Sequence, residues 1–494
     1  MTISNTQATL DLFKSALATP SEELRKTIST GTGLVPFDLQ APAKNLYPVA
    51  TPLRNVIPRV GGGVGTATNW KSIFAINGSG YDAMGWVPEG QRTARMNYSA
   101  INKAASYKTM GEEDSITFEA INAGKTFEDV AATGVMRILQ KMMLKEENAI
   151  LGGNNSMSLA TPSAPTASSV LTGGAIPTGP YSAIVVALTY EGYRSSSMAN
   201  GVATVMSVTG ADGGTYTLSG GSSNKSLATA GAAPGLVSTL TLATNSVVGA
   251  VGYAWYVGIT GSEVLQAITT INSITLTALI TGTQNATAIT ANNSTNSLAY
   301  DGLLTSAFQG GYVNTLANGT AGIGTGLTSS GRGSVNEIDN MLVQMWQQYQ
   351  VSPTVIYCNA QEIKNITSKV LNNGSAPLLR YNSDANSNDP YAVMANGTVS
   401  AYFNPFALDG GIKIPIKIHP LLPPGTLVGW TEQLPAQYQN NETPNVAEMK
   451  VRADYYSLEW PIKTRAREYG VYCEEVLAVY APFAMGVINN IANA

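Results

Sequence analysis

The chain has 494 residues, enough for two to four domains with sizeable hydrophobic cores. Only 12 % of them are charged, about half the usual share, while Gly, Ser, Thr and Asn are abundant. The net charge of −4 argues against a nucleic-acid-binding protein, because such proteins normally carry a basic field. Two cysteines, Cys358 and Cys473, are too few for a disulfide scaffold, so we expect buried, reduced thiols.

Targeting signals are not evident in the sequence. The first residues contain neither a basic start nor a long apolar core, so no signal peptide is expected. The most apolar region, 236–259, is interrupted by Ser, Thr and Asn, which favours strands over a membrane-spanning segment. We therefore expect synthesis in a cytoplasm and no association with a membrane.

Residues 1–66 are expected to form an extended arm. Prolines recur after Gly31, where they block helix continuation and favour extended geometry in the preceding residues. An extended chain cannot bury the apolar residues between these prolines against itself. They need another surface, either the body of the protein or a neighbouring subunit.

Residues 67–111 are predicted to form a long β-hairpin. The outgoing strand lies near 70–76, a glycine-rich part follows, and the return strand covers about 95–110. An isolated two-stranded hairpin is only marginally stable in water, so a long one implies docking on another surface.

Residues 112–156 are dominated by a predicted helix over 127–151. Apolar side chains recur at three- and four-residue spacing, Thr126 is the expected N-cap with Asp129 completing a capping box, and a glycine pair ends the helix. At 1.5 Å per residue this helix would be roughly 37 Å long. We expect it to be the spine along which the other elements are arranged.

Charge is distributed unevenly between these segments. Residues 1–111 carry 11 Lys and Arg against 6 Asp and Glu, whereas residues 112–156 carry 4 against 8. Complementary charge steers and registers protein partners, so one interpretation is a head-to-tail contact between copies of the chain. The alternative is that both are ordinary solvated faces.

Residues 157–300 contain few charged side chains. Short runs rich in Val, Thr, Tyr and Ile alternate with Gly, Ser and Asn turns, which predicts an inserted β-sandwich loosely similar to immunoglobulin or fibronectin type III modules. Residues 253–257 are its expected core strand. The predicted strands are 182–190, 202–209, 215–218, 237–242, 252–259, 264–269 and 273–279.

Residues 301–439 are predicted to form a mixed α/β domain, and residues 440–494 to add long strands, at 449–460 and 468–480, beside the spine helix, followed by an apolar tail. The expected elements of the α/β domain are a helix with a capping box of Ser334 and Glu337, a buried strand at 354–358, a helix from Ala360, and strands near 412–419 and 426–430.

Residues suited to catalysis or metal binding are scarce. The single histidine, His419, has no second histidine or nearby cysteine with which to form a metal site, so a structural role is expected. No G-x-S-x-G motif occurs, and Gly124-Lys125-Thr126 lacks the earlier glycine of a phosphate-binding loop. We therefore expect no enzyme activity, no metal ion and no cofactor.

The order of these parts resembles the major capsid protein of tailed bacteriophages, the Hong Kong ninety-seven type fold. The resemblance rests on the proline-punctuated arm, the glycine-tipped hairpin, the helix that ends in KEENAILGG (145–153), the α/β domain and the C-terminal strands, and it covers all but the insert. The predicted fold class is therefore α+β, a phage major capsid fold with an N-terminal arm (1–66), an extended hairpin loop (67–111), a peripheral domain with the long spine helix (112–156 and 440–494), an axial domain (301–439) and an inserted all-β sandwich that is immunoglobulin-like (157–300).

The resemblance implies a structural protein of the virion that self-assembles into pentamers and hexamers. These would form an icosahedral head shell enclosing double-stranded viral DNA without sequence-specific binding. The hairpin would reach over a neighbouring subunit, and the insert would project outward and touch adjacent capsomers or host surfaces. A separate scaffolding protein, a portal and decoration proteins are implied partners. The candidate inter-subunit contacts are Asp82, Glu89, Arg92, Arg95, Glu112, Glu113 and Glu128.

Two other functions remain open at this point. A surface-layer protein or adhesin built around the β-sandwich fits the low charge, although not the missing signal peptide. A carbohydrate-active enzyme would need a cleft with paired carboxylates, which a sequence does not reveal.

We predict that the double substitution Arg92→Glu and Arg95→Glu impairs shell assembly, because it reverses the charge that the hairpin offers to the acidic segment. Folding should be unaffected, since surface substitutions away from special features usually change stability by about 0.5 kcal/mol or less. Electron microscopy counts closed shells, and circular dichroism checks the fold. Normal shells from this variant would contradict a charge-based contact.

Overall fold

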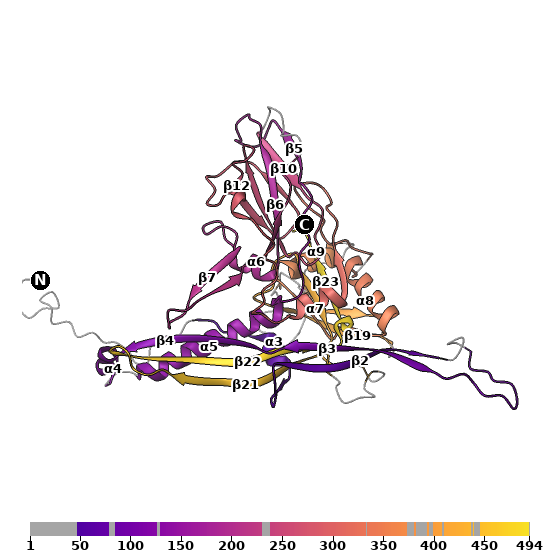
Figure 1. The fold of residues 1–494 in the computed structure, drawn as a ribbon. Coiled ribbons are helices and arrows are strands. Elements are labelled where there is room, and N and C mark those ends of the chain that lie inside the picture. Colours follow the sequence, from indigo (N-terminus) through magenta and orange to yellow (C-terminus); the bar gives the residue numbers. More distant parts are fainter. Residues whose placement is uncertain are drawn as a thin grey trace, which may run out of the picture.

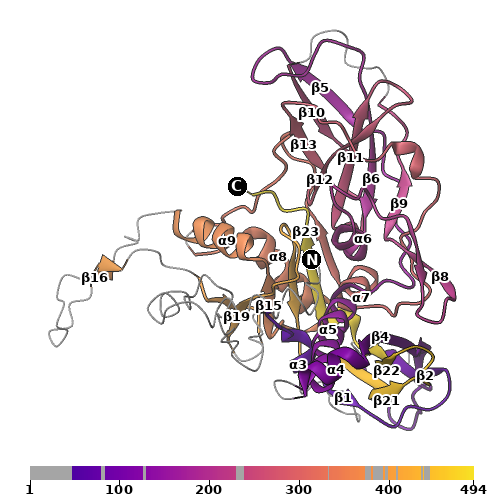
Figure 2. The ribbon, with the colours of Figure 1, turned by 90° about the vertical axis from the view of Figure 1, so that its left-hand side faces the viewer.

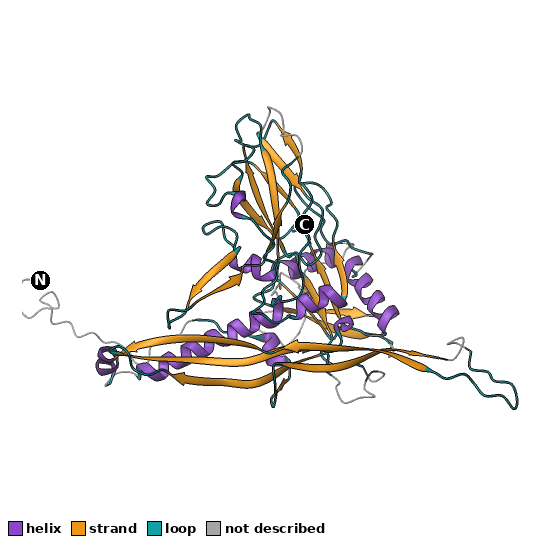
Figure 3. Cartoon of the chain, viewed as in Figure 1, coloured by secondary structure: helices purple, strands orange, loops and turns teal. Residues whose placement is uncertain are grey.

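The computed structural model describes residues 47–78, 84–125, 129–229, 238–331, 333–372, 380–381, 393–394, 399–407, 410–435, 438 and 445–493. A long, flat platform runs across the molecule, an α/β region rises from it, and a β-rich region stands above both (Figure 1). Figure 3 shows strands in the platform and at the top, with most of the helices between them.

The platform is built around α5 (Val130–Gly152), a helix of 23 residues. Its buried Ile138 and Met142 share a hydrophobic core with Val471 and Cys473 of the adjacent sheet. Both cysteines of the chain are buried and free. The sheet has the strand order β1 (Arg59–Val60), β21 (Ala447–Glu459), β22 (Ala466–Val479) and β4 (Lys108–Thr117).

The ends of α5 differ in part from the prediction. Asp129 is the N-cap and accepts hydrogen bonds from the backbone N–H groups of Ala131 and Ala132, each at 3.1 Å, whereas Thr126 lies outside the described residues. Gly153 ends the helix with φ of −55°, so the left-handed conformation is not what requires glycine. A Cβ there would lie 2.4 Å from the carbonyl oxygen of Tyr300, so close chain approach is the reason.

The hairpin consists of β2 (Ala67–Asn77) and β3 (Asn97–Ser106), and it extends beyond the platform (Figure 1). The single return strand predicted over 95–110 is wrong, because the strand divides at Tyr107. β3 pairs with β2, while β4 pairs with β22 from Lys108 to Thr117. The platform therefore begins at β4, before the boundary expected between residues 111 and 112.

The α/β region contains a six-stranded sheet packed with three helices. Its last strand in sequence, β23, lies between β14 and β20, although the sequence placed residues 440–494 beside the spine helix. β23 is completely buried, so its apolar side chains require this central position. The strand order is β14 (Tyr312–Thr315), β23 (Met485–Asn489), β20 (Leu427–Trp430), β15 (Val355–Cys358), β19 (Ile412–Ile418) and β18 (Ala401–Asn404), and the helices are α7 (Leu303–Gly310), α8 (Asn336–Tyr349) and α9 (Ala360–Asn372).

The capping box predicted for α8 is wrong. Val335 occupies the N-cap position and makes no side-chain cap. Glu337 instead accepts hydrogen bonds from the backbone N–H and the hydroxyl of Thr328, and Ser334 donates its hydroxyl to the carbonyl of Ser330. The preceding loop folds back onto the helix, and its Thr328 supplies Glu337 with donors in place of the N-cap backbone N–H of a capping box.

The insert contains two antiparallel sheets that share one core, which includes Val185, Leu242 and Trp255 (Figure 2). The predicted strand 253–257 is confirmed as a buried strand. Classification of this region as immunoglobulin-like stays a prediction. One sheet contains β13 (Ser273–Leu276), β10 (Thr239–Ala243) and β5 (Thr166–Val170), and the other contains β12 (Val264–Thr269), β11 (Gly252–Gly258), β6 (Ser182–Leu188) and β9 (Ser222–Lys225).

Two predicted strands of the insert lie outside these sheets. β7 (Val205–Thr209) and β8 (Thr215–Ser219) pair only with each other and form a separate ribbon. No helix among the described residues is apolar over a length sufficient to cross a membrane. The remaining short elements are α3 (Pro52–Val56), α4 (Phe118–Gly124), α6 (Tyr190–Ser195), η2 (Ala286–Ala288), η4 (Pro482–Ala484), β16 (Arg380–Tyr381) and β17 (Val393–Met394).

Candidate functional site

The hairpin presents a group of large apolar side chains to solvent. Trp86, between the two strands, is 93 % exposed. Contiguous apolar patches on a soluble protein mark interaction surfaces. The exposed apolar residues of the hairpin are Ile73, Phe74, Ile76, Met84, Trp86, Val87, Met96, Tyr98 and Ile101.

Strand pairing assigns several of these side chains to one face. Ile76 pairs with Tyr98, and Ile73 pairs with Ala100, two residues further along β3. Directly paired residues share a face of the ribbon, and the register shift between Ile73 and Ala75 keeps Ile73 on the same side as Ile76 and Tyr98. We call these three side chains the hairpin face.

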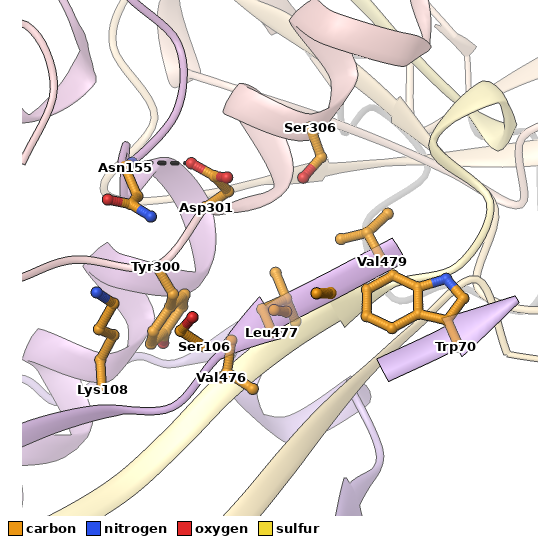
Figure 4. A pocket seen from close by; sticks show the side chains of 12 residues that line it. Trp70, Ser106, Lys108, Asn155, Tyr300, Asp301, Ser306, Val476, Leu477 and Val479 are labelled. Carbon is orange, nitrogen blue, oxygen red and sulfur yellow. Dashed lines mark hydrogen bonds between the residues drawn. The ribbon is translucent and has the colours of Figure 1, made fainter. Parts of the chain in front are cut away.

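The base of the hairpin is anchored on the platform. Trp70 meets Tyr480 edge-on, with ring centroids 5.3 Å apart. A cavity of about 160 Å³ lies beside this contact, between the hairpin, β22 and the start of α7 (Figure 4). At its rim Asp301 accepts the backbone N–H of Asn155 at 2.8 Å, which ties the two ends of the insert together (Figure 4). The base is therefore held while the hairpin face is left uncovered.

Glu147 of α5 lies in the interior with no exposed side-chain surface. Its carboxylate accepts the backbone N–H groups of Leu53 and Arg54, at 2.9 and 2.8 Å. These donors belong to the first turn of α3, where backbone N–H groups have no partner within the helix. Glu147 thus caps α3 from a position 93 and 94 residues away in sequence.

His419 approaches the same carboxylate from the α/β region. Its Nε2 lies 2.7 Å from Oε1 of Glu147, and its Nδ1 accepts the backbone N–H of Leu421 at 3.2 Å. Because Nδ1 is an acceptor, the ring proton is on Nε2 and is donated to Glu147. The expected structural role of the single histidine is therefore a link between the α/β region and the platform.

The neighbouring Glu146 is also completely buried. It accepts hydrogen bonds from Nε of Arg54 at 2.7 Å, from the guanidinium of Arg59 and from the hydroxyl of Tyr455. Arg59 lies on β1, so this contact fixes the strand that precedes the hairpin.

A third buried carboxylate, Glu475 of β22, completes the arrangement. It accepts from Nη2 of Arg59 at 3.2 Å and from the hydroxyl of Tyr300 at 3.3 Å. Nη2 of Arg59 also contacts Asp454 at 2.8 Å. We call Arg54, Arg59, Glu146, Glu147, His419 and Glu475 the carboxylate cluster.

Burial and neighbouring charges shift the pKa values of Glu475, Arg59 and the adjacent Tyr300. Burial, together with the charge of Glu146, raises the pKa of Glu475 to about 8. Burial alone would lower the pKa of Arg59, but the carboxylates of Glu146 and Glu475 raise it, so this guanidinium stays charged. Burial and the neighbouring Glu475 raise the pKa of Tyr300 well above its ordinary value, so its hydroxyl remains a donor.

The candidate contacts chosen from sequence are distributed over two parts of the chain. Glu89, Arg92 and Arg95 are exposed beyond the hairpin strands, and the hairpin points away from β4 (Figure 1). Glu112 forms an ion pair with Lys145, and Glu113 accepts a hydrogen bond from the hydroxyl of Tyr472. Asp82 and Glu128 lie outside the described residues. A role of these residues between subunits stays a prediction.

Sequence reasoning missed the carboxylate cluster. Two adjacent glutamates near the end of an apolar helix are the signal that could have found it, because such residues are almost never buried without partners. Their partners, however, lie far away in sequence. In the described part of the chain, no group of three or more His, Cys, Asp and Glu side chains has an arrangement suited to a metal ion.

No known protein-family model matches the chain, and no curated protein matches it. The similar solved structures include the capsid of a native GTA particle, with 8 % identity and a TM-score of 0.40, covering 94 % of this chain and 98 % of that chain. The capsid of Myoviridae phage XM1 has 8 % identity and a TM-score of 0.40, covering 92 % of this chain and 96 % of that chain. The capsid of cyanophage P-SCSP1u has 8 % identity and a TM-score of 0.39, covering 96 % of this chain and 99 % of that chain. All three are structures of capsids.

We predict that Glu147→Ala detaches α3 from the platform. The substitution leaves the amides of Leu53 and Arg54 and the ring of His419 without their buried acceptor, and each unpaired buried donor costs about 1–3 kcal/mol of unfolding free energy. Hydrogen exchange at the two amides should accelerate. The control Glu474→Ala removes a part-exposed ion pair with Arg452 and a hydrogen bond with Tyr456, and it should cost about 1 kcal/mol or less. Unchanged exchange at residues 53 and 54 would refute the capping role.

A second prediction concerns pH. Folded Glu475 keeps its proton up to about pH 8, whereas the unfolded chain releases it near the ordinary pKa of 4.5. The folded state therefore binds more protons in this window, and its stability falls as pH rises through it. Glu475→Gln cannot titrate, so its stability relative to wild type should increase between the two values by about 1.4 kcal/mol for each pH unit, and so by at most about 5 kcal/mol. Urea unfolding across the window measures this, and a constant difference between the two proteins would contradict it.

Proposed function

We propose that the chain is a structural capsid subunit that self-assembles into a closed shell through its hairpin. The observation that carries the proposal is the hairpin face, which is apolar, uncovered and attached to a platform fixed by the buried carboxylate cluster. Burying one such side chain contributes about 1.5–3 kcal/mol, so the hairpin face offers several kcal/mol to a partner. A second copy of the chain is the partner that a repeating shell supplies.

The contact between copies is head-to-tail. The hairpin projects from one end of the platform and differs in shape from the rest of it (Figure 1). Two different surfaces that meet in this way generate a ring when the rotation between copies closes. Pentamers and hexamers are such rings, and together they form an icosahedral head shell.

The parts of the chain have separate roles in this proposal. The platform (112–156 and 440–479), with β4 at its edge, is the peripheral domain, and the six-stranded sheet with its helices is the axial domain at the ring centres. The insert stands off the platform and projects outward (Figure 1). The shell encloses double-stranded viral DNA without reading its sequence, in keeping with a net charge of −4. A scaffolding protein, a portal and decoration proteins complete the virion, and the chain is made in the host cytoplasm without catalytic activity.

We predict that Ile73→Ser, Ile76→Ser and Tyr98→Ser together abolish shell formation, because they remove the apolar surface that a neighbour covers. The matched control is Val170→Ser with Leu171→Ser, which changes two apolar residues of the insert that are 56 and 60 % exposed. Electron microscopy of the purified chain with and without scaffold, over a salt series, should show closed shells or rings for wild type and control. A wild-type chain that remains monomeric under every condition would overturn the proposed function and favour a surface adhesin.

A further inference from the structure

The ribbon of β7 and β8 has two chemically different faces. Met206 pairs with Leu218, and Val208 pairs with Tyr216, so these four apolar side chains point to one side. The other face carries Ser and Thr except at its first residue, and its members are Val205, Ser207, Thr209, Thr215, Thr217 and Ser219. We call the two sides the apolar and the polar face of the ribbon.

The apolar face lines an open groove. The ribbon descends from the insert towards the platform (Figure 1), and the groove, of about 770 Å³, lies between it and the strand β4 with the helix α5. Val208, Tyr216 and Leu218 line one side of the groove, and Met110 lines the other. Tyr216 nevertheless remains 49 % exposed. A lone two-stranded ribbon is marginally stable, so an uncovered apolar face indicates a missing partner.

The groove carries acidic and basic side chains beside its apolar ones. Glu112, Glu113 and Glu191 line it together with Lys108 and Lys145, and Asp212 lies in the turn of the ribbon. Glu112 is paired with Lys145, whereas the partner of Glu113 is the neutral hydroxyl of Tyr472. Burial and the nearby Asp301 raise the pKa of Glu191 to about 7. Lys108 donates to the carbonyl of Ser297, so Glu113 and Asp212 are the acids that remain for a basic partner.

The hairpin tip, residues 84–98, has the complementary composition. It carries exposed Trp86, Met84 and Met96 together with Arg92 and Arg95. Apolar anchors combined with arginine are the residues that concentrate binding energy at protein interfaces. The hairpin of the same chain cannot occupy the groove, because it continues from β4 in the direction away from the ribbon (Figure 1).

Resting on the proposed function, we propose that the groove receives the hairpin tip of a neighbouring copy and that the β7–β8 ribbon closes over it as a clamp. The apolar face of the ribbon covers Trp86 and the two methionines, and the acids of the groove pair with the arginines. The insert is then an assembly device that locks neighbouring subunits, in addition to being a projection from the shell.

Site-specific cross-linking tests the contact directly. The photo-reactive residue p-benzoylphenylalanine replaces Tyr216, and shells are assembled from a mixture of ¹⁵N-labelled and unlabelled chains. Mass spectrometry should find cross-links between labelled and unlabelled copies that join position 216 to residues 84–98. Cross-links confined to one copy, or to any other segment, would overturn the clamp.

A pair of matched variants tests how much the apolar face of the ribbon contributes to holding the hairpin tip. Val208→Asn with Tyr216→Asn changes the apolar face, and Ser207→Asn with Thr217→Asn changes the polar face. In assembled shells, trypsin should cleave after Arg92 and Arg95 about tenfold faster in the first variant than in the second, a change equivalent to roughly 1.4 kcal/mol. If the first variant forms no shells while the second variant forms them, this result also supports the clamp.

The outcomes separate this inference from the proposed function. Wild-type shells with equal cleavage of both variants overturn the clamp and leave the capsid proposal intact. Loss of shells in both variants also overturns it, because the polar face would then matter as much as the apolar face. A wild-type chain that forms no shells overturns both proposals.

Discussion

The buried carboxylate of Glu147 is the interaction on which the arrangement of the chain depends. A carboxylate without water is tolerated only when hydrogen-bond donors replace the lost solvation. Here the donors are the amides of Leu53 and Arg54 and the ring of His419, which come from the segment before the hairpin and from the α/β region. The long helix, the segment before the hairpin and the α/β region therefore adopt their positions together. If any one of them were displaced, buried polar groups of the others would lose their hydrogen-bond partners.

The buried carboxylates also explain how a two-stranded hairpin can present a binding surface in a fixed direction. Arg59 is held by Glu146 and by pairing of β1 with β21, and the first hairpin strand begins at Ala67, eight residues later. Trp70 then packs on Tyr480 at the edge of the platform. The hairpin consequently leaves the platform in a fixed direction, and less of the free energy gained from a partner is used to order it.

The local sequence pattern was sufficient to predict those helices and strands whose own side chains determine their structure. Helical spacing located α5 and α8, and continuous apolar runs located β11, β15 and β20, because burial of those side chains leaves few alternatives. β5 (TASSV) and β9 (SSNK) have no such pattern and exist through pairing with β10 and β6. The carboxylate cluster and the position of β23 depend on contacts between distant segments, which no short window of sequence contains.

The junction of the insert determines where its ribbon lies. Gly153 and Gly302 face each other with a hydrogen bond of 2.8 Å, and a Cβ on Gly302 would lie 2.6 Å from the carbonyl oxygen of Ala149, so the two ends of the insert meet at the end of α5. Tyr190, at the start of α6, donates its hydroxyl to Asn148 of the same helix at 2.8 Å. Because α5 also borders the groove, one helix sets the height of the ribbon above the platform. The attachment of the insert to this helix therefore holds the ribbon at the position from which it can close over the hairpin tip of a neighbouring copy.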